Sequence, residues 1–190
     1  KNFKANVPAV HAEQGCIEYG ATVDTDGGPF AKFGPDTFVV IGTAHAPIRR
    51  PFALTRLDFD TPLGRVSTDR DLVDRLARRG GGELLDDELA HRDEHSVEFQ
   101  ALWLRHVLGA RPGLSIVPVL AGGIHRFVED ERSPRSDPAI ADFVAALREL
   151  ARERGPRLCI VASVDLAHVG PKYGDDEPIT YDNRGTTFTT

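Results

Sequence analysis

The sequence has little of what would place it in several specialised classes of protein. Only two of its 190 residues are cysteines, Cys16 and Cys159, which excludes a small scaffold held together by several disulfides. Cys159 lies in an apolar run, where a reduced and buried thiol is expected. No apolar run approaches the ~20 residues of a membrane-spanning helix, and the first residues lack the apolar core of a signal peptide. We therefore expect a cytoplasmic protein with no membrane partner.

A basic surface is also missing. The chain has 23 Lys and Arg against 29 Asp and Glu, a formal net charge of -6, and its basic residues are scattered among acidic ones. This pattern disfavours a nucleic-acid interface. The glycine clusters lack the spacing of a phosphate-binding loop, so no nucleotide site is predicted. We expect the partner to be a small-molecule substrate, a peptide or another protein.

What the sequence contains is typical of one globular domain. Its length allows a substantial core, and hydrophobic residues at 41% and charged residues at 27% are close to the averages for globular proteins. We interpret residues 1–190 as a single domain whose first 36 residues are mostly loop. The chain has no initiating methionine and ends in a polar string, as a fragment of a longer protein would.

Three short apolar runs predict strands. They are rich in β-branched residues, which is typical of strands buried on both faces of a parallel sheet, and they extend over Thr37 to Gly42, Leu114 to Leu120 and Arg157 to Val164. Pro118 removes a ladder donor from the second run, which favours an edge or a bulge at that position.

Helical periodicity fills the intervals between these runs. Helices are predicted to begin after Asp69, near Glu94 and after Asp137, because each position offers a capping carboxylate or a favourable negative charge. The apolar side of the middle helix is expected to include Val97, Ala101, Leu104, Val107 and Leu108, widened by Phe99 and Trp103. The order strand, helices, strand, helix, strand predicts an α/β fold with a parallel sheet covered on both sides.

Two of the predicted strands lead into histidines. His45 follows the first strand, and Asp165 and His168 follow the third. Because ligands of open parallel sheets bind outside the carboxyl ends of the strands, we expect these side chains to converge. Imidazoles with a carboxylate are ligands of non-haem iron, copper and zinc. The simpler alternatives stay open: a histidine that bonds a backbone carbonyl, and Asp165 as a helix N-cap.

A second group of ionisable residues lies at the start of the middle helix. His91 and His95 are four residues apart, as are Glu94 and Glu98, so each pair would share a helix face. His91, Glu94 and His95 also match the H-x-x-E-H pattern of zinc peptidases, in which two histidines bind zinc and the glutamate is the general base. The alternatives are a peptidase site and an exposed, charged helix N-terminus.

Several segments together resemble the Memo-like family, in particular the bacterial proteins called AmmeMemoRadiSam system protein B. The resemblance runs from about Thr37 to Gly174. The matching segments are Val40 to Ala46, Asp60 to Gly64, Asp93 to Glu98, Ile116 to Leu120 and Val164 to Gly170. It implies a three-layer αβα sandwich with a mostly parallel sheet, similar to the catalytic subunit of class III extradiol dioxygenases.

The resemblance also implies a metal-binding cleft with ligands at His45 and His168, lined by Asp165. The family's first cleft histidine usually stands in a P-H-x-x-Y type motif near the N-terminus, and only His11 offers a candidate for it here. If Gly27-Gly28-Pro29 is aligned with the family's G-G-P instead, that position falls on Ala21 and a ligand is missing. Relatives also carry a C-terminal cleft cysteine that this chain lacks.

Two hypotheses follow. In the first, His45, His168, Asp165 and His11 hold an iron or copper ion in a redox or oxygenase-like protein. His95 then acts as a general acid or base, oriented by Glu94 or Glu98, because imidazole exchanges protons near neutral pH. In the second, the cleft is a vestige and the protein is a non-enzymatic binding module for peptides or for partner proteins of the same system.

Overall fold

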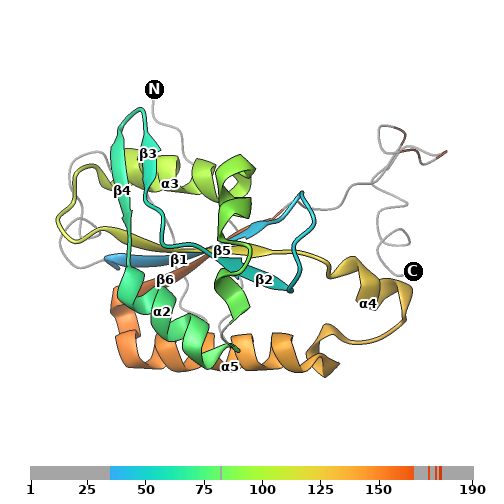
Figure 1. Ribbon diagram of the computed structural model, residues 1–190. Helices are drawn as coiled ribbons and strands as arrows, with labels where there is room; N and C mark the ends of the chain where they lie inside the picture. Colours follow the sequence, from blue (N-terminus) through green and yellow to red (C-terminus); the bar gives the residue numbers. More distant parts are fainter. Residues whose placement is uncertain (1–34, 82, 165–170, 172–173, 175, 177–190) are drawn as a thin grey trace, which may run out of the picture.

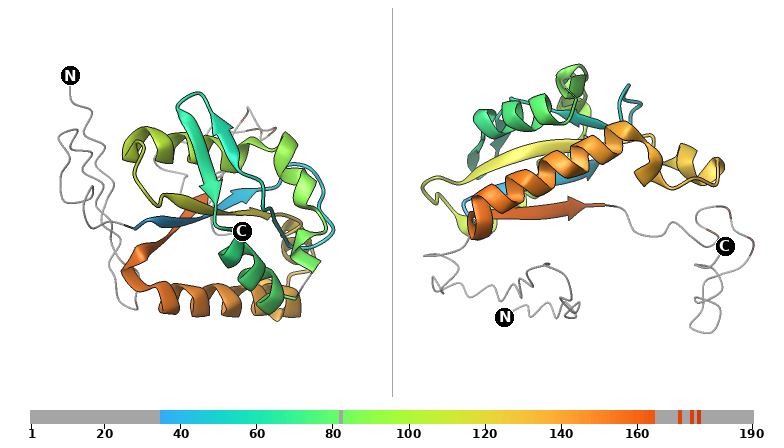
Figure 2. Two further views of the ribbon diagram at one scale, coloured as in Figure 1. Left: turned by 60° about the vertical axis from the view of Figure 1, so that its left-hand side comes forward. Right: turned by 90° about the horizontal axis from the view of Figure 1, so that it is seen from below.

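The computed structural model describes residues 35–81, 83–164, 171, 174 and 176. These residues form a mixed sheet between two helical layers (Figure 1). One face of the sheet is covered by α3 (His95–Leu108), and the other by α2 (Arg70–Arg79) and α5 (Pro138–Arg154) (Figure 2). This is the αβα arrangement that the sequence predicted.

The sheet of the described residues has six strands. They are β1 (Thr37–Thr43), β2 (Phe52–Leu54), β3 (Phe59–Thr61), β4 (Gly64–Thr68), β5 (Ser115–Ala121) and β6 (Leu158–Ser163), in the order β3-β4-β5-β1-β6 with β2 paired to β5. The connections hold α4 (His125–Glu129) and four short 3₁₀ turns, η1 (Glu83–Leu85), η2 (Glu88–Asp93), η3 (Pro134–Ser136) and η4 (Gly155–Arg157).

The first predicted strand is the central one. β1 pairs in parallel with β5 on one side and with β6 on the other, and its residues Val39 and Val40 are fully buried. β4 adds a parallel neighbour to β5, whereas β2 and β3 pair antiparallel to β5 and β4. The sequence did not predict β2, β3 and β4, because runs of three to five residues carry too little periodicity.

Pro118 lies inside the sheet instead of at an outer edge. On one side β5 pairs with β1, where Val40 is the partner of Pro118. On the other side, β5 pairs with β4 as far as Ile116, and its pairing with β2 begins at Val119. Pro118 therefore occupies a gap between two neighbouring strands, where its missing N–H costs no ladder bond.

The helices begin where the sequence predicted. The Asp69 carboxylate accepts a hydrogen bond from the backbone N–H of Leu72, and the Asp137 carboxylate accepts from Ala139 and Ile140. Both helices pack their apolar sides against the sheet, which gives a core that includes Leu72, Leu76, Phe143 and Leu150. A second core lies under α3 on the opposite face of the sheet.

Two expectations about burial were wrong. In α3, Val97 and Ala101 are buried, but Phe99, Trp103 and Val107 are exposed. The third predicted strand, β6, is only partly buried and has a single neighbour among the described strands. Periodicity shows which residues share a face, but which faces are covered depends on the neighbours that the fold supplies.

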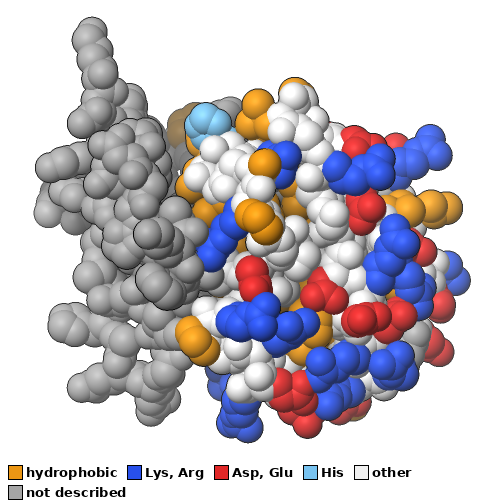
Figure 3. Space-filling model, turned by 90° about the vertical axis from the view of Figure 1, so that its left-hand side faces the viewer, with side chains coloured by type: hydrophobic (Ala, Val, Ile, Leu, Met, Phe, Trp, Pro, Cys, Tyr) orange, Lys and Arg blue, Asp and Glu red, His pale blue; other side chains and the backbone are white. Residues whose placement is uncertain are grey.

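Charged side chains of both signs are interspersed over the described part of the face in Figure 3. Between α2 and α5, for example, Arg75 and Arg79 form ion pairs with Glu153. Among the helices of the described residues, none combines the length and the apolar character needed to cross a bilayer.

Candidate metal centre

His45 follows the carboxyl end of the central strand. β1 ends at Thr43, and the backbone N–H of Ala44 donates to the carbonyl of Ala121 at the end of β5, at 2.8 Å. This bond ties the residue before His45 to the neighbouring strand. The imidazole is therefore presented at the edge of the sheet where the parallel strands β1, β5 and β6 end.

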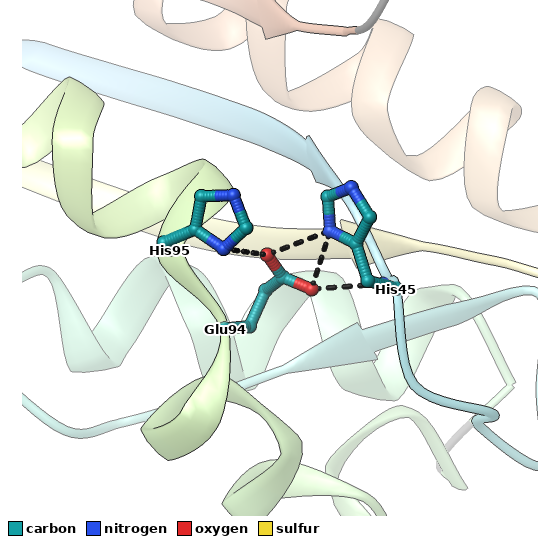
Figure 4. A group of neighbouring side chains, drawn as sticks. All are labelled: His45, Glu94 and His95. Atoms are coloured by element: carbon teal, nitrogen blue, oxygen red, sulfur yellow. Dashed lines mark hydrogen bonds and ion pairs between the residues drawn. The ribbon is translucent and has the colours of Figure 1, made fainter. Parts of the chain in front are cut away.

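Glu94 anchors His45 from the start of α3. It is the N-cap of the helix, and its carboxylate accepts from the backbone N–H of Ser96 at 3.0 Å. The same carboxylate accepts from the backbone N–H of His45 at 2.8 Å and lies 3.0 Å from the ring Nδ1 of His45 (Figure 4). Only 6% of the Glu94 side chain is exposed.

The electrostatics of this pair select one ring nitrogen of His45. Burial by itself would raise the pKa of Glu94, but the hydrogen bonds from His45 and Ser96 lower it to about 2. The carboxylate is therefore ionised at neutral pH and requires a donor at Nδ1 of His45. In the neutral ring this leaves the lone pair on Nε2, which points away from Glu94 in Figure 4.

His95 completes the group. Its Nδ1 lies 3.4 Å from the Glu94 carboxylate, and its ring stacks on that of His45 with a centroid distance of 5.0 Å and an interplanar angle of 15°. The second nitrogen of His95 points away from Glu94 on the same side as that of His45 (Figure 4). Both imidazoles are substantially exposed.

These three side chains could hold a metal ion. Among the described residues, they form the group whose potential ligand atoms all lie within 4.8 Å of one another. The Glu94 carboxylate already accepts several hydrogen bonds, so it is better suited to orienting an imidazole than to binding the metal itself. A carboxylate that fixes the far nitrogen of a histidine is the usual support of a histidine ligand.

Comparison with known proteins identifies the family. A family model described as Memo-like protein matches residues 29–187. The chain belongs to the Memo-like family. It is 34% identical to the MEMO1 family protein of Thermococcus onnurineus (strain NA1) over 142 residues, which are 74% of this chain and 45% of that protein. It is 32% identical to the MEMO1 family protein of Aquifex aeolicus (strain VF5) over 147 residues, 77% of this chain and 35% of that one.

The MEMO1 family protein of Methanococcoides burtonii (strain DSM 6242 / NBRC 107633 / OCM 468 / ACE-M) is also 34% identical, over 138 residues that are 72% of this chain and 46% of that protein. This Memo-like chain thus spans less than half of the length of these relatives. The match confirms the resemblance that the sequence motifs indicated.

The expected convergence of His45 with Asp165 and His168 stays a prediction. The parallel register pairs Gly42 of β1 with Ser163 of β6, so the two strands end side by side. His45 leaves the first of these ends. Asp165 and His168, which follow the second end, lie outside the described residues, as does His11.

The end of β6 is bonded to the helix that carries the site. The Ser163 hydroxyl donates to the carbonyl of Ser96 at 2.8 Å and accepts from the side-chain amide of Gln100 at 3.0 Å. The Ser96 hydroxyl in turn donates to the carbonyl of Thr43 at the end of β1, at 2.8 Å. The start of α3 is therefore tied to the carboxyl ends of both strands.

His91 does not join His95 in the way that the H-x-x-E-H pattern requires. His91 is buried, and its Nε2 lies 3.0 Å from the carbonyl of Ala53 in β2. The two histidines are in different elements, since His91 is in η2 and α3 begins at His95. The four-residue spacing therefore does not place them on one helix face, and the geometry does not support the peptidase site.

Of the two glutamates expected to orient His95, Glu94 is the one in the group around it. Glu94 is near His95, as anticipated, but its shorter contacts are with His45. Glu98 is exposed on α3 and is not a member of the group around Glu94. The sequence offered no signal for the pairing of Glu94 with His45, because the two residues are 49 positions apart.

Proposed function

We propose that this Memo-like chain binds a redox-active transition metal, iron or copper, through the Nε2 atom of His45. The observation that supports the proposal is the buried Glu94 carboxylate, which holds the His45 ring by Nδ1, so that the neutral ring carries its lone pair on Nε2. This carboxylate is buried at the edge of the sheet and is bonded to both the backbone and the ring of one histidine, which is how a supporting carboxylate orients a histidine ligand.

The proposed ligand set combines His45 with His168, Asp165 and His11. Imidazole and carboxylate ligands suit iron and copper, and a set of three or four leaves coordination positions open. When bound, such an ion would supply one-electron chemistry at an open position. This makes the proposed activity that of an oxygenase-like or other redox protein acting on a small molecule.

In this proposal the chain's own residues provide orientation and proton transfer. Glu94 fixes the His45 ring by accepting from two donors of this residue, the backbone N–H and Nδ1. His95 presents its Nε2 beside that of His45 and is open to solvent. We assign His95 the role of general acid or base, because its ring lies beside that of His45 and imidazole is the side chain that most often transfers protons in enzymes.

Metal analysis tests the proposal. The purified chain is titrated with Fe(II) under anaerobic conditions and with Cu(II), and the bound metal is counted in the wild type and in His45→Ala. We expect about one ion per wild-type chain and a loss of at least tenfold in affinity in the variant. The matched control is His125→Ala, an exposed histidine of α4, which should leave the affinity unchanged.

The outcomes separate the hypotheses. A wild-type chain that binds neither metal would overturn the proposal and favour the non-enzymatic binding module. Equal losses in His45→Ala and His125→Ala would show that binding is unspecific. Zinc binding that His91→Ala abolishes would restore the peptidase interpretation.

A further inference from the structure

His45 lies in an exposed loop that buries little apolar surface of its own. The loop covers residues 44–51, between β1 and β2, and residues 45–50 are exposed except for Ile48, which is half-buried. Segments with few buried apolar contacts are the parts of a fold that open most easily. The position of the His45 ring therefore depends on hydrogen bonds between this loop and its surroundings.

The two ends of the loop are tied to the carboxyl end of β5. The backbone N–H of Ala44 donates to the carbonyl of Ala121 at 2.8 Å. At the other end, the backbone N–H of Gly122 donates to the carbonyl of Pro51 at 3.0 Å. A Cβ at Gly122 would lie 3.0 Å from Cγ1 of Ile48, so the glycine leaves room for this side chain of the loop. These contacts close the loop at its ends.

Two carboxylates hold the residues between these ends. Asp87 is the N-cap residue of η2, and Glu94 is the N-cap residue of α3. The Asp87 carboxylate accepts from the backbone N–H of Arg49 at 2.6 Å and from its side-chain Nε at 2.9 Å. Glu94 contacts the backbone N–H and the ring of His45 in the same manner (Figure 4). Each carboxylate therefore fixes both the backbone and the side chain of one loop residue.

Asp87 does not cap its own helix. An aspartate at an N-cap usually accepts from a backbone N–H two or three residues further on, but Asp87 makes no such bond. Its two oxygens are bonded instead to Arg49, which is 38 positions away. The Arg49 side chain is 72% exposed, and an exposed ion pair contributes little to stability. The bonds of Asp87 therefore matter chiefly for where they place the loop.

The segment that carries both carboxylates is itself fastened next to β2. The Glu88 carboxylate accepts from the backbone N–H of Arg56, two residues after β2, at 2.6 Å. The buried ring of His91 lies 3.0 Å from the carbonyl of Ala53 within β2. Residues 87–94 are thus anchored to the sheet, and the loop that they hold is anchored with them.

We propose that Asp87 is a positioning residue of the metal centre, which sets the place of His45 by holding Arg49 of the same loop. This inference rests on the proposed function of His45 as a metal ligand. Without Asp87 the loop keeps its two ends and the contact with Glu94, but its second half is released. Metal binding then has to order the loop as well, and that entropy cost lowers the affinity.

Anaerobic Fe(II) titration of the full chain gives the first readout. Asp87→Ala should raise the dissociation constant about tenfold, as is typical of groups that support a ligand. Arg49→Ala keeps the backbone N–H that Asp87 accepts, so its loss should be smaller. The matched control is Asp60→Ala, which removes another exposed aspartate–arginine pair, with Arg65 in the hairpin of β3 and β4. Its affinity should equal that of the wild type.

Nitrogen NMR of the imidazoles in the metal-free chain gives a second readout, which does not depend on metal. In the wild type His45 should carry its proton on Nδ1, facing Glu94. Asp87→Ala should shift part of the population to the other tautomer, whereas Asp60→Ala should not. The signals of His45 are assigned by their absence in His45→Gln. Buried His91 is the internal reference, since its signals change only if the fold is lost.

The two readouts keep this inference apart from the proposed function. Wild-type affinity in Asp87→Ala, or an unchanged tautomer of His45 in that variant, would overturn the positioning role of Asp87. An equal loss of affinity in Asp60→Ala would overturn it too. A wild-type chain that binds no metal would overturn the proposed function, whereas the tautomer of His45 would still show whether Asp87 positions the ring.

Discussion

The carboxylate of Glu94 accepts hydrogen bonds from the backbone N–H and lies against the ring of His45, although the two residues are 49 positions apart in the sequence. The pair joins the segment that follows the central strand β1 to the N-cap of α3. It also orients the imidazole on which the proposed metal centre depends. Several consequences of this arrangement can be measured.

Glu94→Gln should weaken metal binding without removing a proposed ligand. The amide is uncharged, so it favours the Nδ1–H form of His45 less strongly and polarises the ring less. Substitution of the groups that support a histidine ligand typically costs 10–100-fold in metal affinity. We expect a loss in this range by anaerobic Fe(II) or Cu(II) titration, with the fold retained.

Glu98→Gln is the control for this prediction. It makes the same chemical change four residues further along α3, at an exposed position outside the group around Glu94. Its metal affinity should match that of the wild type. Equal affinities for Glu94→Gln and the wild type would contradict the role assigned to Glu94.

His91 should make the protein less stable in mild acid. Burial lowers the pKa of His91 to about 4 from its usual 6.5, and the bond to the Ala53 carbonyl only partly opposes this effect. Between these values the unfolded chain binds the proton and the folded chain does not. The contribution is therefore complete above pH 6.5 and decreases as the pH falls toward 4, by up to about 3 kcal/mol.

Urea unfolding at several pH values between 7.5 and 4 measures this effect. His91→Gln should flatten the pH dependence, whereas His125→Gln, at an exposed site, should not. Glu94 acts in a lower pH range. Its pKa is lowered from 4.5 to about 2, so its contribution to stability is complete above pH 4.5 and is lost as the pH falls through 2. An unchanged slope in His91→Gln would exclude His91 as the source.

Gly42→Ala should disturb the contact between β1 and α3. A Cβ at this position would meet the Ser96 side chain and lie 2.9 Å from Cγ2 of Val97. Both neighbours belong to the first turn of α3, which follows Glu94. We expect a loss of about 1–3 kcal/mol in the free energy of unfolding, together with weaker metal binding as the helix moves away from His45.

A double-mutant cycle with Ser96→Gly checks the physical cause. Removing the Ser96 side chain takes away the nearer of the two side chains that the new methyl group would meet, and Val97 remains. The double variant should therefore be less destabilised than the sum of the two single variants, by at least ~0.5 kcal/mol. Strict additivity would show that the methyl group does not clash with the Ser96 side chain.

Ser163→Ala should loosen the end of β6. The hydroxyl donates to the Ser96 carbonyl and accepts from Gln100, so its removal leaves two groups without this partner and should cost about 1–2 kcal/mol by chemical denaturation. Ser136→Ala removes an exposed bond within a local turn and should stay within about 0.5 kcal/mol of the wild type. Similar costs for both would contradict the role of Ser163.

Much of the architecture was predictable because its signals are local. The run at Thr37–Thr43 is strand-forming wherever it packs, and the Asp69 and Asp137 carboxylates cap the helices that follow them. His45 could also be assigned to the carboxyl edge of the sheet, because it follows the end of a parallel strand by only two residues.

Tertiary structure alone decided which of these elements are covered and which side chains meet. Phe99 and Trp103 have the spacing of an apolar helix face, yet no described element packs over them. The apolar sequence of β6 is typical of an interior strand, but β6 has only one neighbour among the described strands. His91 matches a ligand motif but turns to a carbonyl of β2, while Glu94 reaches the end of β1. Periodicity and capping act within a few residues, whereas burial and side-chain partners arise from chain segments tens of residues apart, which only the assembled sheet brings together.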